Sequence, residues 1–328
     1  MFLAPSSLLF LMSLLLGSIM AISSNTWFTA WLGLEINLMS MIPLILIKLN
    51  QKLTESSIKY FMVQALSSVV MIISVNFNMQ TSEMSIMNLP EIMLFLSLLI
   101  KSGVPPFHFW FPQMINFMNW TQCFIMFTWQ KIAPLILMTY IYSPYLVIAA
   151  AASTLTGSLG GLNQKKIKMM MAYSSISHAG WLVISSSMSL SLWLVYFLAY
   201  SSITLSVIYP IHLDKIKFIN EMKQNPKINN LTTAMNLLSL GGLPPFLGFS
   251  MKLSVITSMM NFYLSSLTIL FIFPAMISLF YYLRIIYMNL LNKSDLKKIE
   301  YTPTKKNFFF PTFSITLNMI MPLFYFLL

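Results

Sequence analysis

Runs of about 20 apolar residues recur along the whole sequence and are separated by short polar connections. Each run is long enough to cross a hydrocarbon core of about 30 Å as an α-helix. The strands of a membrane β-barrel would alternate over segments of about ten residues, and the sequence does not alternate in that way. The pattern therefore predicts an all-α polytopic membrane protein with about eleven transmembrane helices. They are expected at residues 3–22, 26–47, 58–78, 89–111, 119–141, 144–163, 168–187, 190–212, 232–258, 261–289 and 308–327.

The composition agrees with this interpretation and narrows the chemistry. Of 328 residues, 57% are hydrophobic and 8% are charged, whereas charged residues make up about 25% of ordinary soluble domains. Cys123 is the one cysteine, and the three histidines lack the spacing of a metal site. The sequence contains no glycine-rich phosphate-binding motif. We therefore expect that the chain itself binds no metal, haem or nucleotide.

The net charge of +11 raises the question of a nucleic-acid partner, but the positions of the lysines indicate a membrane topology instead. With eleven spans, the even-numbered connections share one side and contain fifteen lysines, whereas the opposite loops contain neither lysine nor arginine. Such asymmetry places the N-terminus inside and the C-terminus outside, with no nucleic-acid partner. The lysines are Lys48, Lys52, Lys59, Lys165, Lys166, Lys168, Lys215, Lys217, Lys223, Lys227, Lys293, Lys297, Lys298, Lys305 and Lys306.

Two similar motifs indicate an internal repeat. Residues 102–107 read SGVPPF and residues 241–246 read GGLPPF, and both motifs should interrupt a helix because proline removes a backbone donor. The motifs fall in the fourth and ninth spans, and an offset of five spans means that the two units run in opposite directions. We predict two inverted five-helix repeats, residues 1–143 and 144–290, followed by a basic inner loop and a C-terminal helix in 291–328.

Ionisable side chains lie deep inside several predicted spans. A charge at the centre of a membrane helix costs about 2.5 to 3.5 kcal/mol on insertion scales, so such residues usually serve ion or proton movement. The first predicted repeat contains Glu35, Lys101 and Lys131. The second contains His178, Lys252 and Arg284 at the corresponding helices. We expect two half-channels that meet near the middle of the membrane.

Structural alternatives exist for some of these residues. Arg284 is near the lysine-rich face, where a long basic side chain can extend to the interface. His178 has hydroxyl neighbours that could satisfy it as a buried polar group, although its titration range also suits a proton relay. Glu35 could be a structural partner of a lysine. His108 is better explained by a structural or interfacial role than by proton transfer.

Five motifs resemble a known family and occur in that family's order. They are WLGLEIN, KSGVPPFHFW, WQKIAPL, SSISHAGW and GGLPPFLGFSMK. Together they resemble the antiporter-like membrane subunits of respiratory NADH:quinone oxidoreductase, and the similarity covers essentially the whole chain. The 28 methionines also suit a mitochondrial genetic code that reads an isoleucine codon as methionine.

The resemblance implies a proton-translocating core subunit of respiratory complex I, an enzyme that couples electron transfer from NADH to ubiquinone to proton pumping. No redox chemistry is expected in this chain, because FMN, iron–sulfur clusters, NADH and ubiquinone bind other subunits. The implied partners are neighbouring antiporter-like subunits, other membrane-arm subunits, accessory subunits and phospholipids including cardiolipin. The implied location is the mitochondrial inner membrane, with the N-terminus in the matrix and the C-terminus in the intermembrane space.

The resemblance also assigns roles to residues. Glu35 and Lys101 form a pair, Lys131 is the central relay, His178 is a bridge, and Lys252 is the lysine on the outlet side. Two other classes of function stay open at this point. The chain could be a free-standing cation/proton antiporter, or a structural scaffold of a membrane complex.

Overall fold

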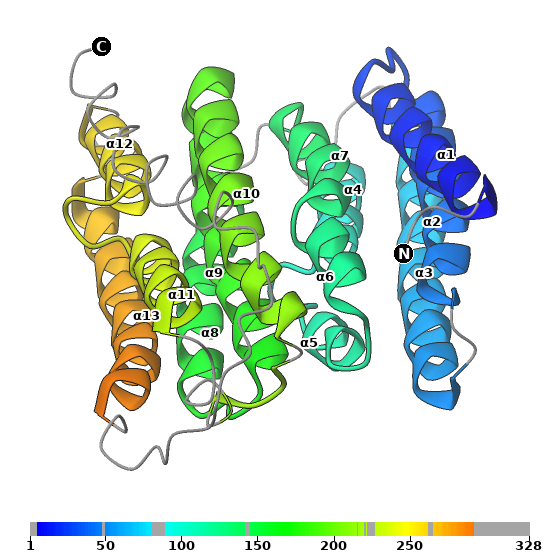
Figure 1. The fold of residues 1–328 in the computed structure, drawn as a ribbon. Helices are drawn as coiled ribbons and strands as arrows, with labels where there is room; N and C mark the ends of the chain where they lie inside the picture. The colour runs from blue at the N-terminus through cyan, green and yellow to red at the C-terminus, as the bar shows by residue number, and fades with distance from the viewer. Residues whose placement is uncertain are drawn as a thin grey trace. The chain divides into compact units, whose positions relative to one another are not determined.

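The computed structural model is helical throughout the part of the chain that it describes (Figure 1). That part consists of residues 5–47, 50–80, 89–141, 145–214, 216–219, 221, 227–261 and 265–291. The predicted last span, 308–327, lies outside these residues. The helices are α1 (Pro5–Ile22), α2 (Trp27–Ile45), α3 (Gln51–Gln80), α4 (Leu89–Ser102), α5 (Trp110–Ile115), α6 (Trp120–Phe127), α7 (Trp129–Thr139), α8 (Tyr145–Leu162), α9 (Ile167–Met188), α10 (Leu190–Leu213), α11 (Lys227–Gly241), α12 (Leu247–Asn261) and α13 (Ser265–Leu291).

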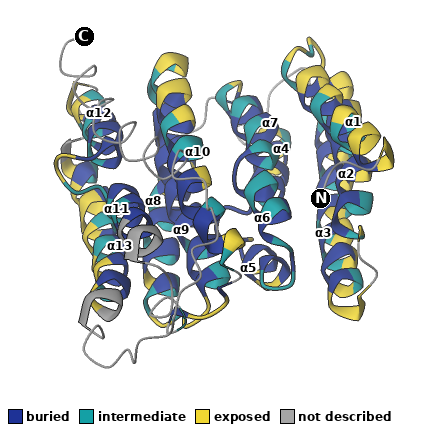
Figure 2. Cartoon of the chain, viewed as in Figure 1, coloured by how far each residue is buried: buried dark blue, intermediate teal, exposed yellow. Residues whose placement is uncertain are grey.

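The distribution of apolar side chains is that of a membrane protein. Among the described residues, six helices are long and apolar enough to cross a bilayer: α1, α2, α3, α8, α10 and α13. Large apolar residues cover the exposed faces of α1, α10 and α13, as Figure 2 shows. Polar side chains such as Ser67, Asn236 and Lys131 are buried instead. Exposed apolar faces around a partly polar interior suit a protein surrounded by lipid.

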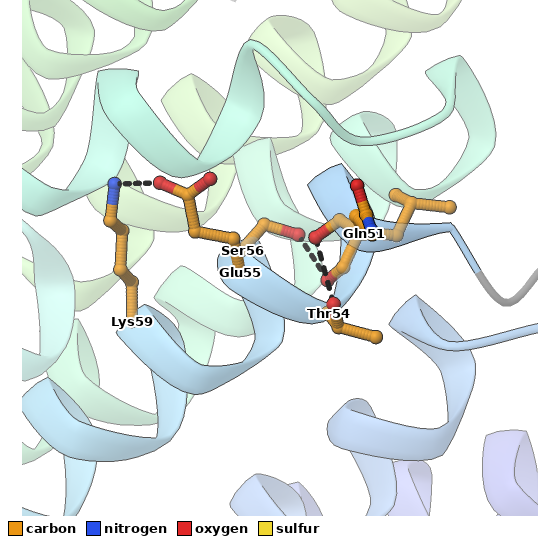
Figure 3. Close-up of polar contacts among 6 residues, drawn as sticks. Gln51, Thr54, Glu55, Ser56 and Lys59 are labelled. Atoms are coloured by element: carbon orange, nitrogen blue, oxygen red, sulfur yellow. Dashed lines mark hydrogen bonds and ion pairs between the residues drawn. The ribbon is translucent and has the colours of Figure 1, made fainter.

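Helix α3 is longer than the sequence pattern predicts, because it begins at Gln51 rather than near residue 58. Its first turns carry exposed polar residues, and Lys59 donates to Glu55 at 2.6 Å (Figure 3). The hydroxyl groups of Thr54 and Ser56 donate to backbone carbonyls within the same helix. Hydropathy marks only the part of a helix that contacts hydrocarbon, so it could not detect these additional polar turns.

The fourth and ninth predicted spans are each divided in two, as the SGVPPF and GGLPPF motifs predicted. Residues 103–109 separate α4 from α5, and residues 242–246 separate α11 from α12. The fifth predicted span is also divided, and this interruption was not expected. Thr128 separates α6 from α7, and its hydroxyl donates to the Phe124 carbonyl at 2.8 Å. Pro134 follows within α7 and lacks an N–H group, so the helical ladder has one donor fewer next to the interruption.

The chain divides into two compact units, Met1–Ser153 and Thr154–Leu328. The prediction placed the boundary between residues 143 and 144, ahead of α8, whereas the compact units divide within that helix.

In the first unit, α1 and α2 are packed closely because glycines face each other. A Cβ atom on Gly33 would lie 2.7 Å from the Gly17 carbonyl oxygen. Indole Nε1 of Trp129, at the start of α7, donates to Ser18 of α1 at 3.1 Å, which joins a third helix to this pair. Small residues at a crossing allow two membrane helices to approach at backbone distance.

In the second unit, glycines of α8 allow the same close approach. A Cβ on Gly157 would clash with the backbone nitrogen of Ser177 in α9. The GSLGG sequence, residues 157–161, therefore serves helix packing.

Two lysine-rich loops of the second unit lie together. The Ile167 amide donates to the Lys217 carbonyl at 3.1 Å, and the Ile219 amide donates to the Lys165 carbonyl at 3.2 Å. Their proximity agrees with the prediction that the connections after the sixth and eighth spans share one side.

Candidate functional site

Four of the six ionisable residues selected from the sequence are buried, and the other two are partly buried. The exposed fraction is 6% for Lys101, 2% for Lys131, 3% for His178 and 6% for Lys252, and Glu35 is partly buried. Arg284 is also partly buried, and it donates to the carbonyl of Gln164 at 3.3 Å. Among the described residues, no three of His, Cys, Asp and Glu gather in a way that could hold a metal ion.

The two broken helices end in the same hydrogen-bonded turn. In the first, the Gly103 amide donates to the Ile100 carbonyl at 3.2 Å, and the Val104 amide donates to the Leu99 carbonyl at 3.1 Å. In the second, the amides of Gly242 and Leu243 donate in the same way to the carbonyls of Ser239 and Leu238, at 3.1 and 3.3 Å. Both glycines have positive φ, +70° and +84°, which residues with a side chain rarely adopt. Each break therefore leaves the C-terminal end of a half-helix inside the protein.

Lys252 binds the end of the half-helix before its break. It extends from α12, and its Nζ donates to the carbonyls of Leu240 at 3.2 Å and Gly241 at 2.9 Å. These carbonyls belong to the last turn of α11, which has no further helical amides to accept from. A helix C-terminus carries a partial negative charge, so it stabilises a buried ammonium group.

The lysine beside the break of the first unit is Lys101. It lies in the last turn of α4, and Gln64 of α3 donates to its carbonyl at 3.2 Å. Glu35 interacts with Lys101 electrostatically, but these two described side chains do not form a direct ion pair. One carboxylate oxygen of Glu35, Oε1, is buried and has no hydrogen-bond partner. The predicted pair is thus brought into the same region without contact.

Lys131 lies in the first turn of α7, directly after the interruption at Thr128. Its Nζ is 5.1 Å from the centroid of the Phe111 ring in α5. An ammonium group over an aromatic face gains a cation–π interaction, which is larger when the site is desolvated. Lys131 therefore contacts the second half of the broken helix whose first half carries Lys101.

A hydrogen-bonded set connects three helices of the first unit, and sequence reasoning missed it. Tyr60 of α3 donates to Gln130 Oε1 at 3.3 Å, and Gln130 Nε2 donates to Asn37 Oδ1 at 2.8 Å. Asn37 is two residues after Glu35, and Gln130 immediately precedes Lys131. The positions of Asn37 and Gln130 beside Glu35 and Lys131 were the sequence signal that could have indicated this set. A buried side-chain amide needs hydrogen-bond partners, and other helices can supply them.

His178 and His108 lie in different environments. His178 Nδ1 is 2.9 Å from the Tyr196 hydroxyl, and its ring centroid is 5.0 Å from that of Tyr200. His108 lies between α4 and α5, where its ring is tilted against that of Phe109 with centroids 4.3 Å apart, and its buried Nδ1 has no hydrogen-bond partner. The structure therefore connects His178, but not His108, to a polar group on a neighbouring helix.

Broken helices with buried ionisable side chains at their ends are typical of multi-span membrane proteins that move ions. The sequence family described as NADH:quinone oxidoreductase/Mrp antiporter, TM, matches residues 24–278. The chain belongs to this family.

Curated relatives match over most of their length. The chain is 42% identical to NADH-ubiquinone oxidoreductase chain 2 of Anopheles gambiae over 295 residues, which are 86% of this chain and 85% of the relative. It is 37% identical to the protein of the same name from Myxine glutinosa, over 96% of this chain and 97% of the relative.

Two solved structures share the fold. The TM-score is 0.82 for a chain of respiratory complex I from Thermus thermophilus, at 20% identity over 97% of this chain and 77% of that chain. It is 0.77 for a chain of the Mrp complex from Dietzia sp. DQ12-45-1b, at 18% identity over 85% of this chain and 59% of that chain.

Proposed function

We propose that the chain is a core membrane subunit of respiratory NADH:ubiquinone oxidoreductase, in the place of chain 2, and that it moves protons across the mitochondrial inner membrane. The observation that carries this proposal is the position of three buried lysines beside two broken helices. Lys252 is held by the carbonyls at the end of α11, Lys101 lies at the end of α4, and Lys131 lies against α5. The family match and the curated relatives support the assignment to this enzyme.

Proton movement would depend on the charge near each lysine. Burial disfavours the charged amine, whereas a nearby carboxylate or helix end favours it. Two unit charges about 7 Å apart interact by about 2.4 kcal/mol at an effective dielectric constant of about 20. Moving one charge through 100 mV requires about 2.3 kcal/mol. A carboxylate at such a separation would therefore change the charge environment of a buried lysine enough to drive proton release, and we propose that Glu35 acts on Lys101 in this way.

The remaining assignments follow from this function. The full architecture would have eleven transmembrane helices, including two inverted five-helix repeats, with the N-terminus in the matrix. Glu35, Lys101, Lys131, His178 and Lys252 would form the proton path, with Arg284 at its lysine-rich end. FMN, iron–sulfur clusters, NADH and ubiquinone would bind other subunits. Partners would be neighbouring membrane-arm and accessory subunits, together with phospholipids such as cardiolipin.

Replacement of Lys101 by Met tests the function. The purified complex carrying Lys101→Met should assemble, but in liposomes its proton yield per NADH oxidised should fall by the share that this subunit conducts. Lys59→Met is the matched control, because the Lys59 side chain is 38% exposed and, within the described part of the chain, forms its ion pair with Glu55 in the first turns of α3. A normal proton yield in Lys101→Met would remove Lys101 from the mechanism.

Two other functions make different predictions. The likeness to the Mrp complex gives a free-standing cation/proton antiporter a structural basis. Under our proposal, the purified chain alone in liposomes should exchange no sodium for protons. For a structural scaffold, Glu35→Gln combined with Lys131→Met should leave pumping unchanged, whereas we expect that double variant to lose it.

A further inference from the structure

The second unit contains four buried tyrosines that the assignments above do not use, and two of them contact His178. Tyr196 and Tyr200 are on α10, and Tyr281 and Tyr282 are on α13; each is at most 1% exposed. The hydroxyl groups of Tyr200, Tyr281 and Tyr282 are buried, and their polar neighbours are serines of α9 and, for Tyr281 and Tyr282, each other. Buried hydroxyls need hydrogen-bond partners because desolvation is costly, and bound water commonly supplies those that side chains do not.

The four tyrosines interact with one another. Tyr200 interacts electrostatically with both Tyr196 and Tyr282, and Tyr281 interacts with Tyr282. The rings of Tyr281 and Tyr282 have their centroids 4.5 Å apart. The four side chains, which come from two helices, are therefore treated as one tyrosine cluster rather than as four separate sites.

One side of this tyrosine cluster reaches His178. The Tyr196 hydroxyl is 2.9 Å from His178 Nδ1, a hydrogen-bond distance for either tautomer of the ring. The Tyr200 ring packs against the same imidazole, with centroids 5.0 Å apart. A proton on His178 therefore has a phenol oxygen within direct reach.

The other side of the cluster reaches the broken helix that holds Lys252. A Cβ on Gly241 would lie 3.5 Å from Cδ2 of Tyr282, so that ring packs directly on this glycine. The carbonyl of the same Gly241 accepts from Lys252 Nζ at 2.9 Å. Tyr282 therefore packs against the residue to which the lysine amine is bound.

Serines of α9 complete the cluster. Ser174, Ser175 and Ser177 interact with Tyr282, Tyr200 and Tyr281 respectively. Each serine donates its own proton to a backbone carbonyl of α9, at 2.7 to 2.8 Å. Their oxygens are therefore left as acceptors that face the tyrosines.

We infer that this tyrosine cluster, with water held among its hydroxyls, carries protons between His178 and Lys252. The inference rests on the proposed function of proton translocation. In each step, a hydroxyl oxygen accepts one proton as its own proton leaves toward the next oxygen. One O–H bond forms for each one that breaks, and no electron is transferred.

The direct test removes two hydroxyls and keeps the rings. In the complex reconstituted in liposomes, Tyr200→Phe combined with Tyr282→Phe should assemble normally and lower the proton yield per NADH to that of a Lys131→Met variant. Tyr287→Phe is the matched control, because Tyr287 is also on α13 but is 64% exposed. A proton yield equal to that of the control would overturn the inference.

Running Lys131→Met in parallel separates the two proposals. If only the double tyrosine variant pumps normally, the cluster is not on the path and the proposed function stands. If Lys131→Met pumps normally as well, the proposed function itself fails. A density map of the unmodified complex gives an independent result: water among Tyr200, Tyr281 and Tyr282 is expected, and a dry cluster would overturn the inference.

Discussion

At the scale of single residues, buried charge is stabilised here by dipoles and rings. Lys252 is bound by two backbone carbonyls, and Lys131 lies over the face of Phe111. Glu35 influences Lys101 from a distance. A direct buried ion pair would be strongly destabilised if either partner lost its charge, since the other charge would then be left uncompensated. Backbone carbonyls, an aromatic ring and a distant carboxylate leave no uncompensated charge in direct contact when the lysine loses its proton. This arrangement suits lysines that must release a proton.

The amide of Gln130 should be important for stability beside Lys131. Gln130→Leu leaves the Tyr60 hydroxyl and Asn37 Oδ1 without their partner, at a cost of about 1–3 kcal/mol for each buried group. We expect a lower melting temperature of the assembled complex. Gln51→Leu is the control, because the Gln51 side chain is exposed at the start of α3. Equal melting temperatures for the two variants would contradict the importance of this set.

At the scale of elements, the two breaks share a turn but place their lysines differently. Lys101 precedes its break and Lys252 follows its break, yet both lie at the C-terminal end of a half-helix. The turn geometry is thus shared by two segments far apart in the sequence, and each turn has a lysine beside it. We take this as support for the predicted repeats.

Two glycine variants should therefore differ in effect. Ala at either position 103 or 242 must adopt a positive φ, at a cost of about 1–2 kcal/mol. A Cβ on Gly242 would also lie 3.2 Å from Lys252 Nζ, whereas the nearest atom to a Cβ on Gly103 is 3.4 Å away. We expect Gly242→Ala to displace the amine and to lower the proton yield more than Gly103→Ala does. A lower proton yield for Gly103→Ala than for Gly242→Ala would argue against a role for the Lys252 binding position in proton transfer.

Sequence patterns were informative about the elements and less so about the site. Apolar runs located the helices, and the two proline motifs located both breaks, because each signal is local. The interruption at Thr128 depends on a hydroxyl competing for a nearby carbonyl, and a threonine in an apolar run gives no warning of it. Tyr281 and Tyr282 read as apolar residues in hydropathy, although their hydroxyls join a polar cluster. The cluster forms only because particular helices pack together, and a single sequence does not show which helices do so.

At the scale of the whole molecule, the asymmetry of lysines predicts the orientation in the membrane. The loops at Lys165 and Lys217 pair through their backbones, so they must share a side. Under the proposed function, that side is the matrix.

Site-directed labelling can test this orientation, since the one native cysteine, Cys123, is buried. Lys165→Cys should react with an impermeant thiol reagent only from the matrix side of the membrane. Asn25→Cys, in the connection between α1 and α2, should react only from the intermembrane side. Both residues are exposed. Labelling of the two positions from the same side would reject the predicted topology.

The two backbone carbonyls that bind Lys252 have a consequence for how this lysine releases its proton. An uncharged amine still has two N–H groups, enough to continue donating to both Leu240 and Gly241. Deprotonation would therefore break neither hydrogen bond. The side chain could remain in position through repeated protonation and deprotonation. The Lys252 amine could therefore change between its charged and uncharged forms without a movement of the side chain. The electric field of the surrounding residues would then control when each proton is transferred.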